Sequence, residues 1–331
     1  MRLDRFITLN IAQPFRRLFK VQGSRFKVQG FGGNPSLPIL MYHSISRRDE
    51  SHMGDYFKLC TPPERFRLQM ETLKEHGYIG TDLETGLAQL NSVGVASGQA
   101  IQKSSNLGPR TSDLCPSAAL PVVLTFDDGF RDFHTEALPV LAEFGFTATM
   151  FLATDFIKDE RRSFSGTECM TWSEVRECRK FGTHFGSHTV SHAKLIELDW
   201  PEIESEISNS KSEIEHQLGA RSTSFAYPYA FPQVDKKFCR RLRETLVATG
   251  HQSCVTTIAG RVAVGDDPYT LRRLPVNAAD DSALLTAKLA GSYDWLAAPQ
   301  ALVKKVKAWK TRRRSPASPS AIEGERAGVR G

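Results

Sequence analysis

Short apolar segments alternate with amphipathic segments from residue 37 to about residue 300. The apolar segments have the composition of buried strands, whereas the amphipathic ones repeat apolar residues at three- and four-residue intervals. In 201–218, for example, Ile203, Ile207 and Ile214 share one helical face. The pattern predicts strands at 37–43, 78–80, 122–126, 147–153, 183–187, 224–227, 254–258 and 270–276, and helices at 61–77, 83–90, 135–144, 173–181, 201–218, 235–249 and 282–289.

Strands that alternate with helices in this way predict parallel βα units. About seven such units predict an α/β fold, a distorted (β/α) barrel of about seven parallel strands. In such barrels, functional residues lie where the strands end. We therefore expect one domain at 37–300, with a basic extension at 1–36, a flexible Ser-, Gly- and Asn-rich insertion at 91–119, and a basic, disordered tail at 301–331.

The charge of the chain is concentrated at its two ends. The net charge is +6, yet residues 1–30 carry +6 and residues 301–331 carry +7, which leaves −7 for the body. The body is therefore not expected to bind nucleic acid. The basic N-terminal residues predict either a solvated arm or peripheral contact with an anionic membrane through Arg16, Arg17, Lys20, Arg25 and Lys27.

Two further features bear on where the protein works. No apolar run is long enough for a membrane span, and no secretory signal follows the first basic residues. The six cysteines contain no Cys-x-x-Cys pair and are expected to be reduced thiols. These features predict a cytoplasmic protein, or one at the inner face of the membrane.

Two adjacent carboxylates end the apolar strand predicted at 122–126, in the segment Thr-Phe-Asp127-Asp128-Gly. Asp-Gly is also a common turn dipeptide, so a plain turn is the simplest alternative. Two adjacent acids repel one another unless a cation or a proton separates their states. A metal would resolve the repulsion, with one carboxylate as ligand and the other free to act as a base.

Two histidines four residues apart, His188 and His192, follow the strand predicted at 183–187. On a helical turn they would face the same way and could share one metal ion. Such a pair is often surface decoration, but this one lies at the same predicted rim as the two acids. One carboxylate and two imidazoles suit zinc or another first-row divalent ion. His184 lies in the strand itself and is a less favoured third ligand.

Two other strand ends bring candidate residues to this rim. Aromatic residues and proline fill 225–230, Phe-Ala-Tyr-Pro-Tyr229-Ala, either as core packing or as the wall of a sugar cleft with an inward backbone N–H. His43 ends the first predicted strand in Met-Tyr-His43, where it is either a site residue or a hydrogen-bonded structural histidine.

The motifs TFDDG, SHTVSH and a proline–aromatic turn, in this order, resemble the polysaccharide deacetylases, which share the NodB homology domain and form carbohydrate esterase family 4. MYHSI, FAYPYA and LRRLPVNAADD resemble a subgroup found with exopolysaccharide synthesis, in which the motif order is shifted. The similarity covers about residues 37–297. It implies a NodB-like barrel that removes N-acetyl groups from a carbohydrate.

The resemblance also implies roles for individual residues. Asp128, His188 and His192 would bind a divalent metal, Zn²⁺ or alternatively Co²⁺ or Mn²⁺. Asp127 would be the catalytic base, and the backbone N–H of Tyr229 would stabilise the oxyanion. The substrate partner would be an N-acetylated carbohydrate.

Three family features are missing from the expected places. The arginine that usually steadies the base is absent from 226–230, the late Leu-x-x-His histidine is absent from 271–281, and no Asp-x-x-Trp segment lies near 254–258. His43 is the substitute for the general acid, by analogy with the shifted subgroup. These gaps leave an alternative, a catalytically impaired carbohydrate-binding protein that keeps the metal.

Overall fold

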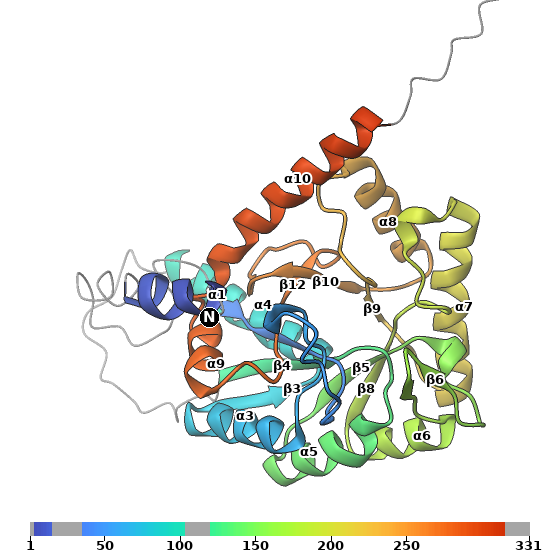
Figure 1. The fold of residues 1–331 in the computed structure, drawn as a ribbon, viewed down its shortest axis with the longest axis horizontal. Coiled ribbons are helices and arrows are strands. Elements are labelled where there is room, and N and C mark those ends of the chain that lie inside the picture. Colours follow the sequence, from blue (N-terminus) through green and yellow to red (C-terminus); the bar gives the residue numbers. More distant parts are fainter. Residues whose placement is uncertain (1–2, 15–34, 103–119, 315–331) are drawn as a thin grey trace, which may run out of the picture.

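The computed structural model describes residues 3–14, 35–102 and 120–314 (Figure 1). Its centre is a closed barrel of seven strands in the order β2-β12-β10-β9-β8-β5-β4, with every neighbouring pair parallel and β4 returning to β2. The predicted seven-stranded barrel is thus confirmed. The strands are β2 (Ile39–Tyr42), β4 (Leu120–Phe126), β5 (Ala148–Leu152), β8 (Thr183–Ser187), β9 (Ser224–Ala226), β10 (Ser253–Ala259) and β12 (Leu271–Pro275).

Five other strands of the described residues lie outside this ring. The strand β3 (Tyr78–Thr81) pairs in parallel with the first half of β4. Two small antiparallel pairs are formed by β1 (Ser36–Leu37) with β11 (Val262–Ala263), and by β6 (Ser163–Phe164) with β7 (Thr167–Glu168). The β6–β7 hairpin matters here, because it lies in the connection that follows β5 and reaches the rim of the barrel.

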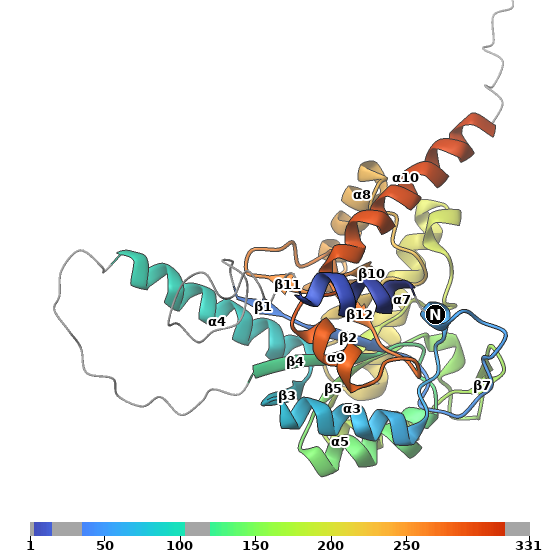
Figure 2. The same cartoon turned by 60° about the vertical axis from the view of Figure 1, so that its left-hand side comes forward.

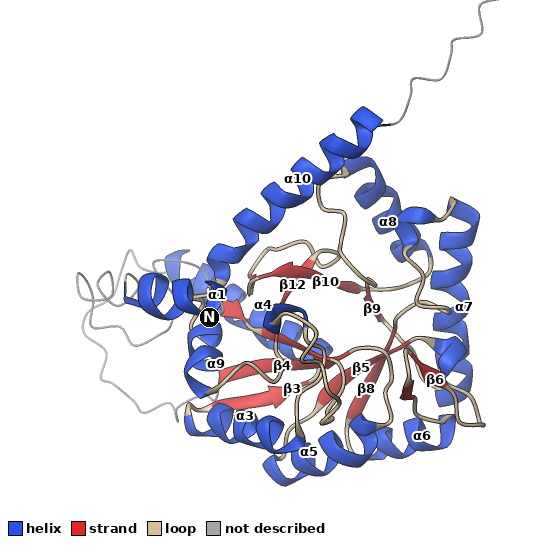
Figure 3. Cartoon of the chain, viewed as in Figure 1, coloured by secondary structure: helices blue, strands red, loops and turns tan. Residues whose placement is uncertain are grey.

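Helices surround the barrel, as Figure 3 shows. Most of them pack their apolar faces on the outward-facing side chains of the strands, which buries the outer face of the parallel sheet, whereas the helix at 83–102 packs Leu83 and Leu90 against Val123. The helices are α3 (Pro63–Glu75), α4 (Leu83–Gln102), α5 (Leu138–Phe144), α6 (Trp172–Lys180), α7 (Trp200–Leu218), α8 (Lys236–Ala248), α9 (Ser282–Leu289) and α10 (Ala297–Arg314).

Strand β4 illustrates how the barrel delivers its polar residues. Side chains alternate across a strand, so Leu124 and Phe126 join the outer core while Val123 joins the inner one. Thr125 and Asp127 follow Val123 on the inner side. The next residue, Asp128, has φ 75° and departs from the extended backbone. The two adjacent acids therefore do not simply point to opposite faces.

Two segments predicted to lack structure are helical. The insertion predicted at 91–119 begins with helix, because α4 continues to Gln102; residues 103–119 lie outside the described residues. The tail predicted to be disordered from 301 is helical to Arg314, within α10. In both cases the helical residues continue a helix that has already begun. Adding residues to a helix costs much less free energy than nucleating one, so a weak helix propensity is enough to keep these residues helical. Figure 2 shows both helices projecting from the barrel.

The start of the chain packs against its far end. The short helix α1 (Leu3–Ile7) and the helical turn η1 (Thr8–Ala12) lie beside α9. Arg5 Nη1 donates to Asp281 Oδ1 at 2.7 Å, and Tyr293 donates to Asp4 Oδ2 at 2.6 Å. The basic residues predicted to contact a membrane lie outside the described residues, so that contact stays a prediction. No described helix combines the length and apolar character that a membrane span needs.

Candidate active site

All six residues predicted to form a site line one cavity of about 490 Å³ at the carboxyl ends of the barrel strands. Parallel strands bring their ends to one rim, which is why residues far apart in the chain meet here. His43 follows β2, Asp127 and Asp128 follow β4, His188 and His192 follow β8, and Tyr229 follows β9.

Asp128, His188 and His192 have the arrangement of metal ligands. The Nε2 atoms of His188 and His192 lie 3.4 and 3.3 Å from Oδ1 of Asp128. Two ligand atoms about 2.1 Å from one ion at a tetrahedral angle would be about 3.4 Å apart. Among the described residues, this is the one group of three His, Cys, Asp or Glu side chains close enough to share an ion.

The electrostatics of Asp128 agree with a cation site. Its Oδ1 atom is buried and has no hydrogen-bond donor among the described residues. Burial raises the pKa of Asp128, but protonated imidazoles at His188 and His192 would lower the pKa far below its usual range, and a cation bound between these residues would act in the same direction. A buried, ionised oxygen without a donor needs a positive charge beside it, so the residues present fit a divalent ion.

A hydrogen bond on the side of the ring that faces away from Asp128 fixes the orientation of His188. Its Nδ1 atom lies 2.8 Å from the carbonyl oxygen of Ala226, the last residue of β9. A carbonyl only accepts, so Nδ1 carries the proton and Nε2 keeps its lone pair for the cavity. Burial lowers the pKa of His188, but Asp128 and Asp127 raise it above its ordinary value.

The prediction that the two histidines lie on a helical turn is wrong. Residues 188–192 form an irregular loop in which Thr189 and His192 have φ 69° and 57°, in the left-handed region. Glu206 of α7 holds this loop: its carboxylate accepts the N–H groups of Val190 at 2.8 Å and Ser191 at 2.9 Å. Non-glycine residues at such φ values need this kind of support.

Asp127 forms a buried, bidentate ion pair with Arg273. Both carboxylate oxygens accept from the guanidinium at 2.7 Å. Burial raises the pKa of Asp127, but the charge of Arg273 outweighs this and holds the pKa below its usual value. The carboxylate is thus ionised and fixed in orientation, as a base must be.

Arg273 corrects the sequence analysis, which found no arginine to steady the base. The side chain comes from β12, where Leu271 and Arg273 face inward and Arg272 is exposed. A signal was present, since a charged residue on the inner face of a barrel strand requires a partner. The partner itself lies 146 residues earlier in the chain.

His43 lies near the same carboxylate, because β2 pairs with β4 and His43 and Asp127 directly follow the paired residues Tyr42 and Phe126. Its Nε2 atom lies 3.9 Å from Asp127 Oδ2. Burial lowers the pKa of His43, although Asp127 and Asp128 act in the opposite direction. A lowered pKa leaves the imidazole mostly neutral near pH 7, so His43 has to take up a proton before it can donate one. The position suits the predicted general acid, and that role stays a prediction.

Tyr229 lies at the mouth of the cavity, with its ring half exposed and 4.7 Å from the ring of His192. Its backbone has φ 56°, and its carbonyl accepts the hydroxyl of Thr257 at 3.0 Å. These contacts fix the peptide beside a proposed metal ligand. That its N–H stabilises an oxyanion stays a prediction.

The C-terminal helix contributes a wall of the cavity that sequence analysis missed. Gln300 and Lys304 of α10 are among the lining residues. Gln300 donates to the hydroxyl of Tyr56 at 2.7 Å and accepts the N–H of Ala259 at 3.0 Å. A basic run near the end of the chain gave no hint of this, because it has the composition of a solvated tail.

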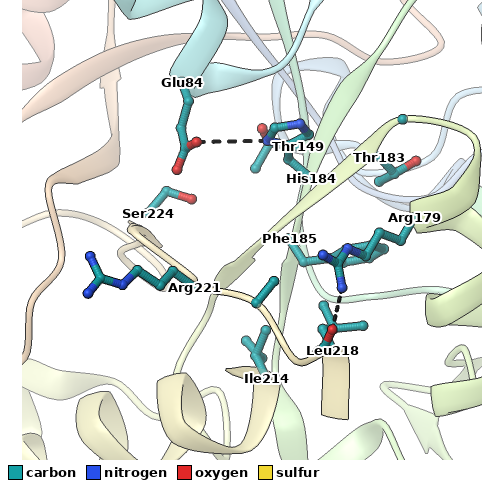
Figure 4. A pocket seen from close by; sticks show the side chains of 12 residues that line it. Glu84, Thr149, Arg179, Thr183, His184, Phe185, Ile214, Leu218, Arg221 and Ser224 are labelled. Carbon is teal, nitrogen blue, oxygen red and sulfur yellow. Dashed lines mark hydrogen bonds and ion pairs between the residues drawn. The ribbon is translucent and has the colours of Figure 1, made fainter. Parts of the chain in front are cut away.

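His184 is not part of this site. It is the second residue of β8, and the two ends of that five-residue strand are roughly 13 Å apart. His184 lines a second, smaller cavity of about 250 Å³ near the start of the strand, together with Glu84 and Arg179 (Figure 4).

Comparisons with known proteins agree with this geometry. Residues 117–249 match the sequence profile of the Polysaccharide deacetylase family. The polysaccharide deacetylase homologue YxkH of Bacillus subtilis (strain 168) is 29% identical over 244 residues, which are 73% of this chain and 71% of YxkH.

Two solved structures share the fold. The Streptococcus pyogenes deacetylase PplD, in complex with acetate, has 22% identity and a TM-score of 0.58 over 78% of this chain and 99% of PplD. IcaB from Ammonifex degensii has 21% identity and a TM-score of 0.59 over 78% of this chain and 97% of IcaB. The segment matched by the family profile includes both the Asp-Asp and the His-x3-His motifs, so the part of this chain that carries the proposed site is similar in sequence to polysaccharide deacetylases.

Proposed function

We propose that this cavity removes N-acetyl groups from a carbohydrate by metal-dependent hydrolysis and releases acetate and a free amino sugar. The family consists of hydrolases that act on carbon–nitrogen bonds. The observation that carries the metal dependence is the buried Oδ1 atom of Asp128, which has two imidazole nitrogens beside it and no hydrogen-bond donor among the described residues.

Asp128, His188 and His192 would hold the ion. When bound, a divalent ion such as zinc polarises an acetyl carbonyl and lowers the pKa of water to about 7. Asp127 takes the proton of the attacking water on the carboxylate that Arg273 keeps ionised. His43 donates a proton to the nitrogen of the leaving amino sugar, and the Tyr229 N–H donates to the carbonyl oxygen.

The alternative is a carbohydrate-binding protein that keeps the metal but does not catalyse. It was favoured by the lack of an arginine on the base and of a late histidine. Arg273 removes the first of these observations, and the position of His43 offers a substitute for the second. The hydrolase is therefore the better-supported function.

The test is acetate release from a panel of N-acetylated oligosaccharides, with Zn²⁺, Co²⁺, Mn²⁺ or a chelator added. We expect release with at least one ion and its loss with the chelator. Binding of oligosaccharide without acetate release under every condition would support the non-catalytic alternative instead.

A further inference from the structure

Among the described residues, three lysine or arginine side chains line the cavity, and a buried arginine, Arg273, lies behind Asp127. Arg273 is neutralised by Asp127. Arg48 lies 3.4 Å from Glu50, and Lys58 lies 2.7 Å from Asp55. The third lining side chain is Lys304, on α10.

Lys304 contacts only neutral oxygens among the described residues. Its Nζ atom donates to the carbonyl oxygen of Phe231 at 2.9 Å and to Oε1 of Gln233 at 3.2 Å. The side chain is partly buried, and burial lowers the pKa of its ammonium group. A partly desolvated ammonium without a counterion is unfavourable, and an anion in the cavity would relieve it.

The position of Lys304 is fixed by the helix that carries it. Gln300 lies one turn earlier on the same face and links α10 both to Tyr56 and to the backbone of β10. Helix α10 contacts β10, and Figure 1 shows it running past this part of the barrel. The ammonium therefore belongs to a braced wall of the cavity and not to a mobile surface chain.

The remaining charges of the cavity do not compensate Lys304. Asp127 is neutralised by Arg273, and in the proposed function Asp128 faces a divalent ion. A ligand that brings a negative charge would thus meet a net positive cavity, which favours its binding and its rate of association.

We propose that Lys304 forms a subsite for an anionic group, a carboxylate or a phosphate, on the N-acetylated glycan, so that the preferred substrate is an acidic glycan. This inference rests on the proposed function of the same cavity. The neutral oxygens of Phe231 and Gln233 orient the ammonium, while the negative charge comes from the substrate.

The experiment compares the wild-type protein with Lys304→Gln and with a matched control, Lys305→Gln, whose lysine is the exposed next residue of the helix. Three substrates are used: neutral N-acetylglucosamine oligomers, oligomers that alternate N-acetylglucosamine with glucuronate, and N-acetylglucosamine oligomers that carry phosphate. The carboxylate and phosphate arms distinguish the two sources of charge.

We expect the wild type to show a kcat/KM at least about tenfold higher for one acidic substrate than for the neutral one, the effect of one charge-assisted hydrogen bond. Lys304→Gln should lose this preference, because KM rises for the acidic substrate by a larger factor than for the neutral one. Lys305→Gln should behave like the wild type.

Calorimetric titration of the same oligomers separates the two hypotheses. If no substrate releases acetate, the proposed function is wrong. The subsite would still be supported if the wild type binds an acidic oligomer more tightly than a neutral one and Lys304→Gln abolishes this difference. The subsite is wrong if the wild type shows no acidic preference in rate or binding, or if Lys304→Gln weakens acidic and neutral oligomers equally.

Discussion

The two ends of strand β8 each place a histidine next to carboxylates, yet only one end has the properties of an active site. At the carboxyl end, His188 Nε2 lies 3.4 Å from Asp128 Oδ1. At the amino end, His184 Nδ1 lies 3.5 Å from Asp82 Oδ1 and 4.0 Å from Glu84 Oε2. Distance alone does not separate the two clusters.

Burial and hydrogen bonding do separate them. The side chain of His184 is 48% exposed, against 3% for His188. Asp82 accepts the N–H of Thr85 at 3.0 Å at the start of α4, and Glu84 accepts the hydroxyl of Thr223. The acids at the amino end are thus engaged in holding the fold, whereas Asp128 Oδ1 has no donor. A buried acceptor without a partner is the more informative sign of a ligand site.

The largest effect is expected from Asp128→Asn, measured against His184→Ala at the opposite end of the strand. Loss of a ligand should lower metal affinity and acetate release by more than about 100-fold, since even residues behind a ligand cost 10- to 100-fold. His184→Ala should stay within about twofold of the wild type. Metal content after dialysis and acetate release measure both; equal effects of the two variants would contradict the comparison.

Asp127→Asn should lower kcat by about 100- to 10,000-fold, because a general base contributes that much. Metal content should remain at the wild-type level, since Asp127 is engaged by Arg273. A variant that turns over normally would show that Asp127 is not the base.

For His43→Gln we expect a loss of kcat of about 100-fold, at the lower end of what a proton donor contributes. Metal binding should again be retained, because no proposed ligand is changed. An unaltered kcat would return His43 to a purely structural role.

Glu206→Gln should weaken metal binding and lower kcat/KM about tenfold, because an amide cannot accept all the donors that the carboxylate accepts from the His188–His192 loop. The matched control is Glu204→Gln, on the same helix, whose exposed carboxylate lies 3.9 Å from Arg241. If the two variants bind metal equally well, Glu206 does not position the ligand loop.

The smallest effect is expected at His251, which precedes β10 at the amino end of the barrel and should affect stability but not catalysis. Burial, assisted by the charge of Lys211, lowers the pKa of His251 to about 3. Because the unfolded pKa is about 6.5, the unfolded state binds more protons between these values. The free energy of unfolding therefore does not depend on the ionisation of His251 above pH 6.5. Below pH 6.5 it falls as the pH falls, by at most about 1.4 kcal/mol per pH unit.

The measurement is the free energy of unfolding of the wild type and His251→Gln at several pH values. The difference between the two should change below pH 6.5 and stay constant above it, with kcat unaffected at neutral pH. A constant difference throughout would mean that His251 has the same pKa in the folded and unfolded states, which would contradict the lowered pKa.

Much of the site could be predicted because its signals are local. The hydrophobic pattern predicts that Asp127 and His188 follow the ends of strands, and parallel strands bring their carboxyl ends to one rim. The pattern could not predict the ion pair between Asp127 and Arg273, because β4 and β12 do not neighbour each other in the ring and their inner faces meet only when the barrel closes. The pattern also could not identify Glu206, because its role depends on the contact between α7 and the loop at 188–192.

The amino-acid sequence by itself determined the order of strands and helices, the rim on which the acids and histidines gather, and the resemblance to polysaccharide deacetylases. The periods of about two and 3.6 residues report which faces are buried, and nothing beyond neighbours along the chain is needed to read them. The tertiary structure alone decided that Arg273 holds the base, that the histidine loop is irregular, and that α10 brings Lys304 to the cavity. These features depend on contacts between segments distant in sequence, which a local pattern does not contain.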